Sequence, residues 1–136
     1  MGKKNIIFKY GDVKRISFVG CNIIVASLLL HLIGNQKKQK EIINKICNSD
    51  ISKIYFFDRV RGCTKEEEER YLGYFASNLQ KKGLPAELIE ELTTESRSNS
   101  PMSFKEQKYL FNKKGFESKI LFKNPNHGFM AYMFYL

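Results

Sequence analysis

Asn22-Ile-Ile-Val-Ala-Ser-Leu-Leu-Leu30 is the stretch that decides the fold, because it is almost entirely apolar. We expect a strand of this composition to be covered by helices on both faces, since neither face offers polar side chains to water. Residues 36–47 follow as a helix with its apolar residues on one side, and Asn35 can cap its first turn. Residues 53–57 form the next strand, and the order strand, helix, strand predicts a right-handed crossover between parallel strands.

Two helices separated by a glycine are expected in the middle of the chain. Thr64 with Glu67 three residues later has the spacing of a capping box, so a helix begins there and ends at Gly83. Pro85 opens a second, short helix. Residues 93–100 are polar and lack helical periodicity, and they predict a mobile surface loop.

The last third of the chain predicts one more helix and a hairpin. Ser103 and Glu106 form a second capping box, and the helix that they begin ends at Gly115. Residues 119–123 and 128–136 are two strands joined by Asn-Pro-Asn, a sequence typical of turns. Neighbouring strands with so short a connection are antiparallel.

At the amino end, residues 5–9 are short, β-branched and aromatic, and they predict a first strand before the turn signal Gly11-Asp12. With this strand included, the order of elements predicts an α/β sandwich with parallel strands, flanking helices and a carboxyl-terminal antiparallel hairpin. The length suits a single domain spanning residues 1–136.

The composition excludes several classes of protein. With 43% hydrophobic residues, 27% charged residues and only 3 prolines, the chain is neither disordered nor collagenous. Three cysteines without a CxxC pair fit neither a disulfide framework nor a zinc cluster, which indicates a reducing compartment. The sequence also lacks an export signal, a lipid signal and a stretch long enough for a membrane span. We therefore expect a cytoplasmic protein without a membrane partner.

The charge of the chain points to anionic partners. The formal net charge is +9, and most of it arises in the first sixty positions, where 11 Lys and Arg face 4 Asp and Glu and the helix of residues 36–47 carries a lysine cluster. This cluster consists of Lys37, Lys38 and Lys40. It could contact an anionic substrate or a nucleic acid. A solvated helix face is the alternative explanation.

Two separated motifs carry a family resemblance. The run Cys21-Asn-Ile-Ile-Val-Ala-Ser-Leu-Leu-Leu-His31-Leu32, the Lys-rich helix and the strand Lys53-Ile-Tyr-Phe-Phe-Asp58 together resemble the class I S-adenosylmethionine-dependent methyltransferases. In that family a strand followed by Leu-His-His precedes a helix and a strand ending in Asp. The later helices and the closing hairpin are similar to the family's last elements in kind and order. The resemblance covers the second half of the family's domain and implies an incomplete doubly wound, Rossmann-like sheet.

The resemblance also implies which parts are missing. The family's first strand and glycine-rich turn would lie before residue 5, so the chain resembles a truncated methyltransferase that is weakly active or inactive alone. Residues 22–30 then lie at an edge of the sheet, and an apolar unpaired edge invites association. A partner chain, a second copy in a homodimer, or residues 5–9 could supply the strand that pairs with this edge.

Several candidate site residues follow the predicted strands directly. Asp12, His31 and Asp58 come just after three strands, and because the carboxyl ends of parallel strands meet at one edge, we expect them in one crevice. His31 could polarise or deprotonate a substrate, Asp58 could bind an amine or hydroxyl, and Arg59 could bind an anionic group. Each also has a structural explanation: a turn at Asp12, a hydrogen-bonded histidine, and a pair that caps a strand end.

The resemblance implies a cofactor site and a reaction. The residues that it implies for binding S-adenosylmethionine are Gly11, Asp12, Val13, Ser27 and Leu30, with the Asp12 carboxylate near the adenine. His31 and Asp58 become the candidate catalytic residues for methyl transfer, a reaction that depends mostly on positioning. The alternative functions are a non-catalytic binding or scaffold module and a basic adaptor that binds nucleic acid.

Overall fold

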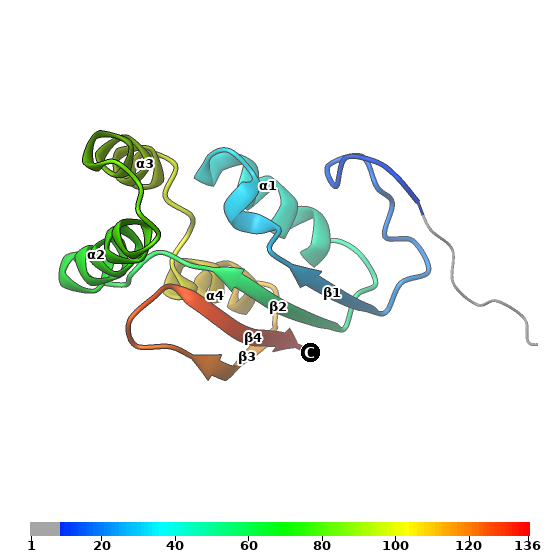
Figure 1. The fold of residues 1–136 in the computed structure, drawn as a ribbon. Coiled ribbons are helices and arrows are strands. Elements are labelled where there is room, and N and C mark those ends of the chain that lie inside the picture. Colours follow the sequence, from blue (N-terminus) through cyan, green and yellow to red (C-terminus); the bar gives the residue numbers. More distant parts are fainter. Residues whose placement is uncertain (1–8) are drawn as a thin grey trace, which may run out of the picture.

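The computed structural model describes residues 9–136 of the chain (Figure 1). The elements in chain order are β1 (Ile23–Ser27), the short 3-10 helix η1 (Leu30–Leu32), α1 (Gln36–Cys47), β2 (Lys53–Arg59), α2 (Lys65–Lys81), α3 (Ala86–Ser98), α4 (Phe104–Asn112), β3 (Glu117–Lys123) and β4 (Phe129–Tyr135). Most of the first predicted strand, residues 5–8, lies outside the described part, and Lys9 is not in a strand.

The strands form one open, mixed sheet in the order β1-β2-β4-β3. β1 and β2 are parallel, as the strand-helix-strand pattern predicts. β4 is antiparallel to both β2 and β3, so the closing hairpin is confirmed and lies at one edge of the sheet. The fold is therefore α/β, with one parallel pair of strands and an antiparallel hairpin.

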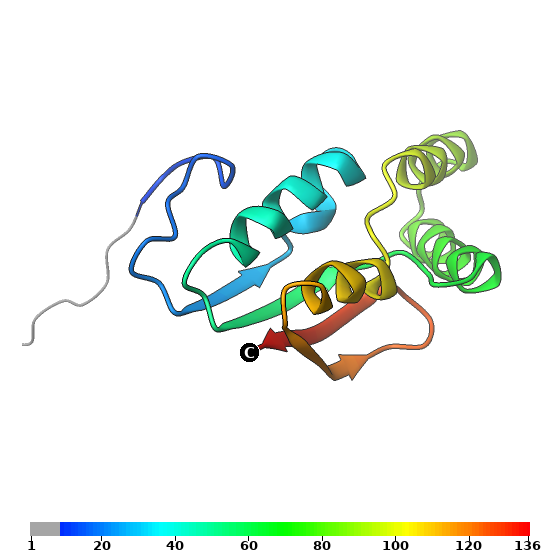
Figure 2. The ribbon, with the colours of Figure 1, turned by 180° about the vertical axis from the view of Figure 1, so that it is seen from behind.

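The core lies between the sheet and the helices α1 and α4, which lie side by side over the same face (Figure 2). Alternate residues of β2 and β4 point into it, and Ile54, Phe56, Tyr132 and Phe134 are at most 2% exposed. Phe111 of α4 stacks on Phe134 with ring centroids 4.0 Å apart. Fully burying an apolar side chain of this size contributes about 2 to 3 kcal/mol, so this layer holds the fold together.

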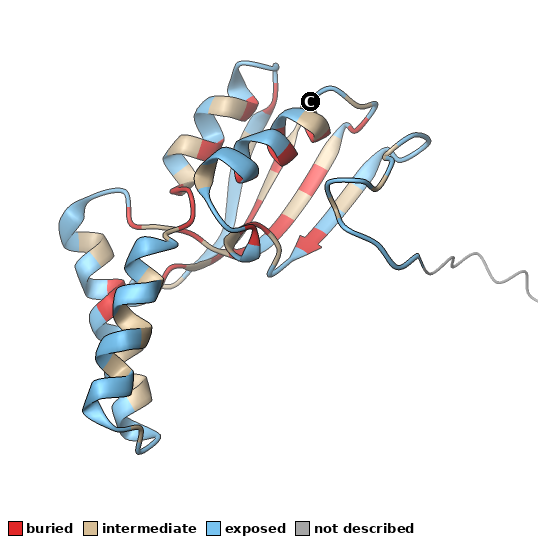
Figure 3. Ribbon diagram, turned by 90° about the horizontal axis from the view of Figure 1, so that it is seen from above, coloured by how far each residue is buried: buried red, intermediate tan, exposed pale blue. Residues whose placement is uncertain are grey.

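The opposite face of the sheet is uncovered, and the expectation that helices cover both faces is wrong for the described residues. Ile23 and Val25 of β1 are 57% and 77% exposed, and Phe57 of β2 is 44% exposed. The reason is that α1 and α4 both lie on the first face, whereas α2 and α3 project from one end of the sheet (Figure 3). An apolar strand predicts that something covers it, but not that the covering element belongs to the same part of the chain.

The two edges of the sheet differ in how they are protected. β3 carries Glu117, Lys119 and Lys123 and has a register irregularity between Ile120 and Phe122. Charges and bulges of this kind discourage pairing with another strand. β1 has no charged residue and pairs without irregularity on its inner side. Of the two edges, only β1 lacks these protective features, so it is the edge suited to pair with a further strand.

The helices α2 and α3 form an antiparallel pair beyond the carboxyl ends of β1 and β2 (Figure 1). The expectation of a mobile loop over residues 93–100 is wrong, since α3 continues to Ser98. Thr93 Oγ1 donates to the carbonyl oxygen of Ile89 at 2.7 Å, and Arg97 makes two hydrogen bonds to the Glu69 carboxylate of α2. Hydroxyl groups bonded back to the preceding turn let a polar sequence remain helical.

The predicted helix starts are confirmed at atomic detail. Asn35, Thr64 and Ser103 each accept a hydrogen bond from the amide three residues later, at 3.0, 3.1 and 3.2 Å respectively. Only Ser103 has the reciprocal bond of a complete capping box. Gly83 and Gly115 follow the helix ends with φ of +79° and +85°, a conformation that glycine adopts without strain.

Two strand ends differ from the prediction. The strand expected over residues 22–30 ends at Ser27, since Leu28 has φ of +52° and the chain then enters η1. A left-handed leucine costs on the order of 1 to 2 kcal/mol, and contacts made by the residues around it must offset this cost. β2 continues beyond residue 57 to Arg59. Asp58 and Arg59 are therefore the last two residues of the strand, paired with β4, rather than residues that follow the strand.

Candidate functional site

Asp58 is the centre of the hydrogen bonding at the carboxyl ends of β1 and β2. Its side chain is fully buried, and its Oδ2 accepts hydrogen bonds from the amides of Leu29 and Leu30 at 3.1 and 2.6 Å. Asp58 Oδ1 accepts a hydrogen bond from the amide of Arg59 at 2.8 Å, and it lies 2.5 Å from His31 Nδ1. A buried carboxylate is stable only when it is bonded in this way, so Asp58 fixes the path of the chain after β1.

This bonding explains the strained residue at the end of β1. The amide of Leu28 still donates to the carbonyl oxygen of Phe57 at 2.8 Å, which continues the ladder between β1 and β2. The left-handed turn at Leu28 then directs the next two amides toward Asp58. Charge-assisted hydrogen bonds are about twice as strong as neutral ones, and they offset the cost of the turn.

His31 is held in one orientation by Asp58. Since an ionised carboxylate only accepts hydrogen bonds, Nδ1 carries the proton that it donates to Asp58, and Nε2 lies on the side of the ring that faces away from Asp58. The ring also meets Phe129 edge to face, with centroids 6.5 Å apart. The side chain is 19% exposed, so a molecule in solution can reach it. This arrangement suits a general base or a hydrogen-bond acceptor for a substrate.

A groove of about 400 Å³ lies beside His31, between the end of the sheet and the α2–α3 pair. The residues that line it are His31, Leu32, Gly34, Arg59, Phe75, Leu92, Glu95, Ser96 and Asn99. Leu32, Phe75 and Leu92 give it an apolar part, and the remaining side chains are mostly polar. Ligands of α/β sheets bind beyond the carboxyl ends of the parallel strands, which is where this groove lies.

Two polar groups in this groove lack a partner within the described chain. The guanidinium of Arg59 forms no ion pair with a carboxylate of residues 9–136. Burial lowers the pKa of Arg59, and the charge of Glu68 partly opposes this. The hydroxyl of Ser96 is buried and has no hydrogen-bond partner there either. The buried, unpaired hydroxyl is costly, and the half-buried Arg59 guanidinium in the same groove is free to pair with an anion, so the two groups together point to an exchangeable ligand.

The structure separates the predicted adenine segment from this site. Asp12 Oδ1 accepts from the amide of Lys14 at 2.9 Å and closes its own turn. Lys45, near the end of α1, holds this turn by donating to the carbonyl oxygen of Lys14 at 2.7 Å. His31 precedes the start of α1, and the segment 9–20 lies at the opposite end of the sheet from α2 and α3 (Figure 1). The expected convergence of Asp12 with His31 and Asp58 is therefore not found, whereas His31 and Asp58 are brought together.

The five residues implied for S-adenosylmethionine do not fit that cofactor as they stand. Val13 and Ser27 do line a common pocket, but its volume is only about 290 Å³. Leu30 is 1% exposed, and its amide is used by Asp58. The carboxylate and hydroxyl groups of the cofactor need free amide donors from a glycine-rich turn. Here Ser27 is followed by Leu28 and Leu29, whose amides are bonded internally.

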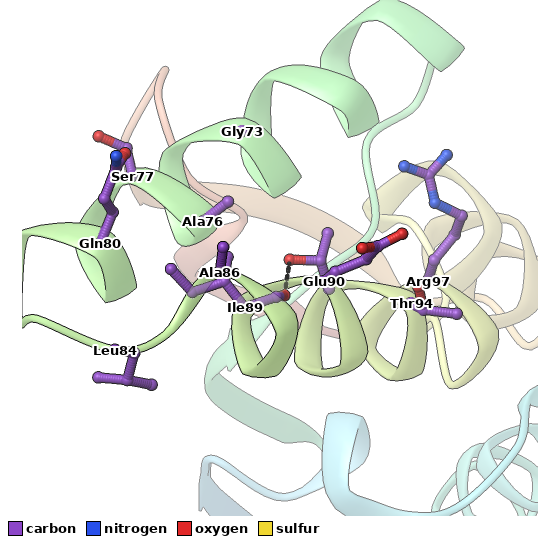
Figure 4. A pocket seen from close by; sticks show the side chains of 11 residues that line it. Gly73, Ala76, Ser77, Gln80, Leu84, Ala86, Ile89, Glu90, Thr94 and Arg97 are labelled. Atoms are coloured by element: carbon purple, nitrogen blue, oxygen red, sulfur yellow. Dashed lines mark hydrogen bonds between the residues drawn. The ribbon is translucent and has the colours of Figure 1, made fainter.

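A larger groove, of about 800 Å³, lies between α2 and α3 (Figure 4). It is lined mainly by small side chains of the two helices, among them Gly73, Ala76 and Ala86. Its arginine, Arg97, is already paired with Glu69. The arginine of this groove is thus engaged by a carboxylate, whereas Arg59 is not, so we place the candidate site at the smaller groove beside His31.

Sequence reasoning found part of this site and missed the rest. His31, Asp58 and Arg59 were expected from their positions after apolar strands. The sequence does not predict Ser96 as a site residue, because a loop is expected over residues 93–100, and it gives no site signal for Phe75 either. Thr93 and Arg97 were a signal for the length of α3, because residues four apart lie on one face of a helix. Thr93 bonds to the preceding turn of α3, and Arg97 bonds to Glu69 of α2.

Comparison with known proteins adds no family to these observations: no family model matches the chain, and no curated protein matches it. Among residues 9–136 no helix has the length and apolarity needed to cross a membrane. The same part of the chain contains no cluster of three or more His, Cys, Asp or Glu side chains arranged to hold a metal ion.

Proposed function

We propose that this chain is a methyltransferase-like half-sheet that acts as a binding module and does not catalyse methyl transfer by itself. The observation that carries the proposal is the buried Asp58 at the carboxyl end of β2, bonded to Leu30 and His31 after β1. These are the residues of the two motifs that resemble the class I methyltransferases, and the fold brings the two motifs into direct contact. The parallel β1–β2 pair and the closing hairpin agree with the same resemblance.

The unprotected edge of β1 and the bare face of the sheet support the idea of a half-sheet. Doubly wound sheets carry helices on both faces, and a further strand-helix unit paired with β1 would cover Val25 and Phe57. In the proposed function this unit comes from another chain, and a second copy of this chain is the simplest source. Covering this face would bury the apolar side chains that are now exposed.

Independent catalysis is disfavoured by the amide hydrogens after β1. The chain from Leu28 to Leu30 uses all three of its amides within the fold, so none remains for a bound cofactor. The role of the His31–Asp58 pair is then to present an oriented imidazole to a molecule in the adjacent groove. This is a binding role, and it becomes catalytic only if a completed sheet holds a methyl donor nearby.

Calorimetric titration of the whole chain with S-adenosylmethionine tests the proposal. We expect no measurable heat beyond dilution, and the same result with S-adenosylhomocysteine. Low-micromolar binding of either compound would overturn the proposal, because it would require free donors that the fold does not offer. The His31→Gln variant is expected to give the same negative result, and it controls for heat that arises from the imidazole.

A further inference from the structure

The groove beside His31 is lined by one arginine, Arg59. Arg59 enters it from the end of β2 without a carboxylate partner among residues 9–136. Lys38 of α1 does not line the groove, but its Nζ lies near Gly34, which does: a Cβ added at Gly34 would be 3.7 Å from that Nζ. The first turn of α1 contains no acidic residue that would neutralise this lysine.

The acidic residues near Arg59 do not form ion pairs with it. The Glu68 carboxylate accepts hydrogen bonds from the amide of Gly62 at 2.6 Å and from the hydroxyl of Ser100 at 3.4 Å. Asp58 is used by the chain after β1. Glu95 lines the groove and is exposed, so its carboxylate competes with a bound anion while remaining free to turn toward water.

Ser96 supplies the second polar group. Its hydroxyl is buried and unpartnered in the described part of the chain, and it lines the same groove as Arg59. A buried hydroxyl without a hydrogen bond costs about 1 to 3 kcal/mol. A ligand oxygen would satisfy both Ser96 and Arg59, and the side of the His31 ring that faces away from Asp58 is available for a polar contact with the same ligand.

We propose that this groove binds the oxyanion of a small organic molecule, a carboxylate or a phosphate, through Arg59 and Ser96, with the nearby Lys38 adding positive charge from α1. The apolar side chains of Phe75, Leu92 and Leu32 receive the body of the ligand, so the class of ligand is a small anion with an apolar or aromatic part. This inference deepens the proposed function, on which it rests for the role of the groove, by naming the class of molecule presented to His31.

Titration of the isotope-labelled whole chain with benzoate, followed by NMR at constant ionic strength, tests the inference. Benzoate is expected to shift the amide signals of Gly34, Arg59 and Ser96 with saturation. Benzamide has the same shape without the charge and is expected to leave these signals unchanged. Phenyl phosphate is the second probe, and the tighter of the two anions identifies the oxyanion that the groove prefers. Equal effects of benzoate and benzamide, or no saturable effect of either anion, would overturn the inference.

Variants locate the binding. Arg59→Gln is expected to weaken benzoate binding at least about tenfold, as the loss of a charge-assisted hydrogen bond implies. The matched control Arg15→Gln removes an equal charge from an exposed position and is expected to leave the affinity unchanged. Glu95→Gln removes the competing carboxylate and is expected to strengthen binding about twofold or more. Unchanged affinity in a folded Arg59→Gln chain contradicts the proposal.

Ser96→Ala provides a variant that keeps the fold, because it removes an oxygen that has no partner in the described structure. It is expected to weaken benzoate binding about threefold to tenfold without lowering stability. The two proposals fail separately. Absence of anion binding overturns this inference and leaves the negative result with S-adenosylmethionine intact, whereas tight S-adenosylmethionine binding overturns the proposed function and leaves a measured benzoate site in place.

Discussion

The amide of Leu30 donates to Oδ2 of Asp58 at 2.6 Å across 28 residues of sequence. Both residues are buried, and the bond joins the turn after β1 to the end of β2. Because the same carboxylate also holds His31, one side chain sets both the local fold and the orientation of the candidate functional group. Its loss should therefore affect stability and the groove together.

Asp58→Asn is expected to lower the free energy of unfolding by about 2 to 3 kcal/mol, since an amide cannot accept all the bonds that the carboxylate accepts. Urea denaturation followed by circular dichroism measures the change. Asp12→Asn is the matched control. Asp12 is exposed in its own turn, so we expect a change within about 0.5 kcal/mol. Equal stability of the two variants would show that the Asp58 bonds are not needed for the fold.

The carboxylate of Glu67 should make stability depend on pH in the acid range. Burial raises its pKa, but hydrogen bonds from Lys123, the Cys63 amide and Tyr71 outweigh burial and lower the pKa from its ordinary value of 4.5 to about 2. A lowered folded-state pKa gives stability that is present above pH 4.5 and is lost as the pH falls toward 2. Solvent screening limits this contribution to about 1 kcal/mol.

Glu67→Gln tests this pH dependence. The variant should be less stable than the original chain at pH 7, and the difference should shrink as the pH falls from about 5 to 2. Denaturant midpoints at a series of pH values measure it. Glu87→Gln, at an exposed position in the first turn of α3, is the control with the same chemical change. A difference between the Glu67 variant and the original chain that stays constant with pH contradicts the assignment.

The edge of β1 should mediate association between copies of the chain. Sedimentation over a range of concentrations is expected to show self-association that Val25→Lys abolishes, because a charge on an edge strand opposes pairing. Val25 is 77% exposed, so the substitution should leave the unfolding free energy within about 0.5 kcal/mol. Leu88→Lys, on α3, adds the same charge away from the edge and should not change association. A chain that stays monomeric at high concentration contradicts this prediction.

Two glycines should respond in opposite directions to alanine. A Cβ at Gly128 would collide with the backbone carbonyl oxygen of Val60, which cannot move aside as a side chain could. Gly128→Ala should therefore lower the free energy of unfolding by about 2 to 3 kcal/mol. A Cβ at Gly73 of α2 would meet nothing within 4 Å, so Gly73→Ala should stabilise the chain by about 0.5 to 1 kcal/mol. Thermal unfolding of both variants measures the difference, and destabilisation by Gly73→Ala would contradict the contact geometry.

Sequence reasoning was most successful where a signal depends on neighbouring residues. The caps at Asn35 and Ser103, the helix ends at Gly83 and Gly115, and the turn of the hairpin were all located in this way. It failed at Leu28 because the positive φ there is stabilised by Asp58, a residue far away in the chain. The site was predicted in the same uneven way, with His31 and Asp58 identified and Ser96 missed.

The sequence by itself determined the order of the main helices and strands, the residues that begin the helices and the glycines that end α2 and α4, since those features are set within a turn or two of chain. Only the tertiary structure decided that α1 and α4 share one face, that the other face is bare, and that α3 brings Ser96 beside Arg59. These outcomes depend on contacts between distant segments, whose energies are summed over the whole fold and leave no local pattern.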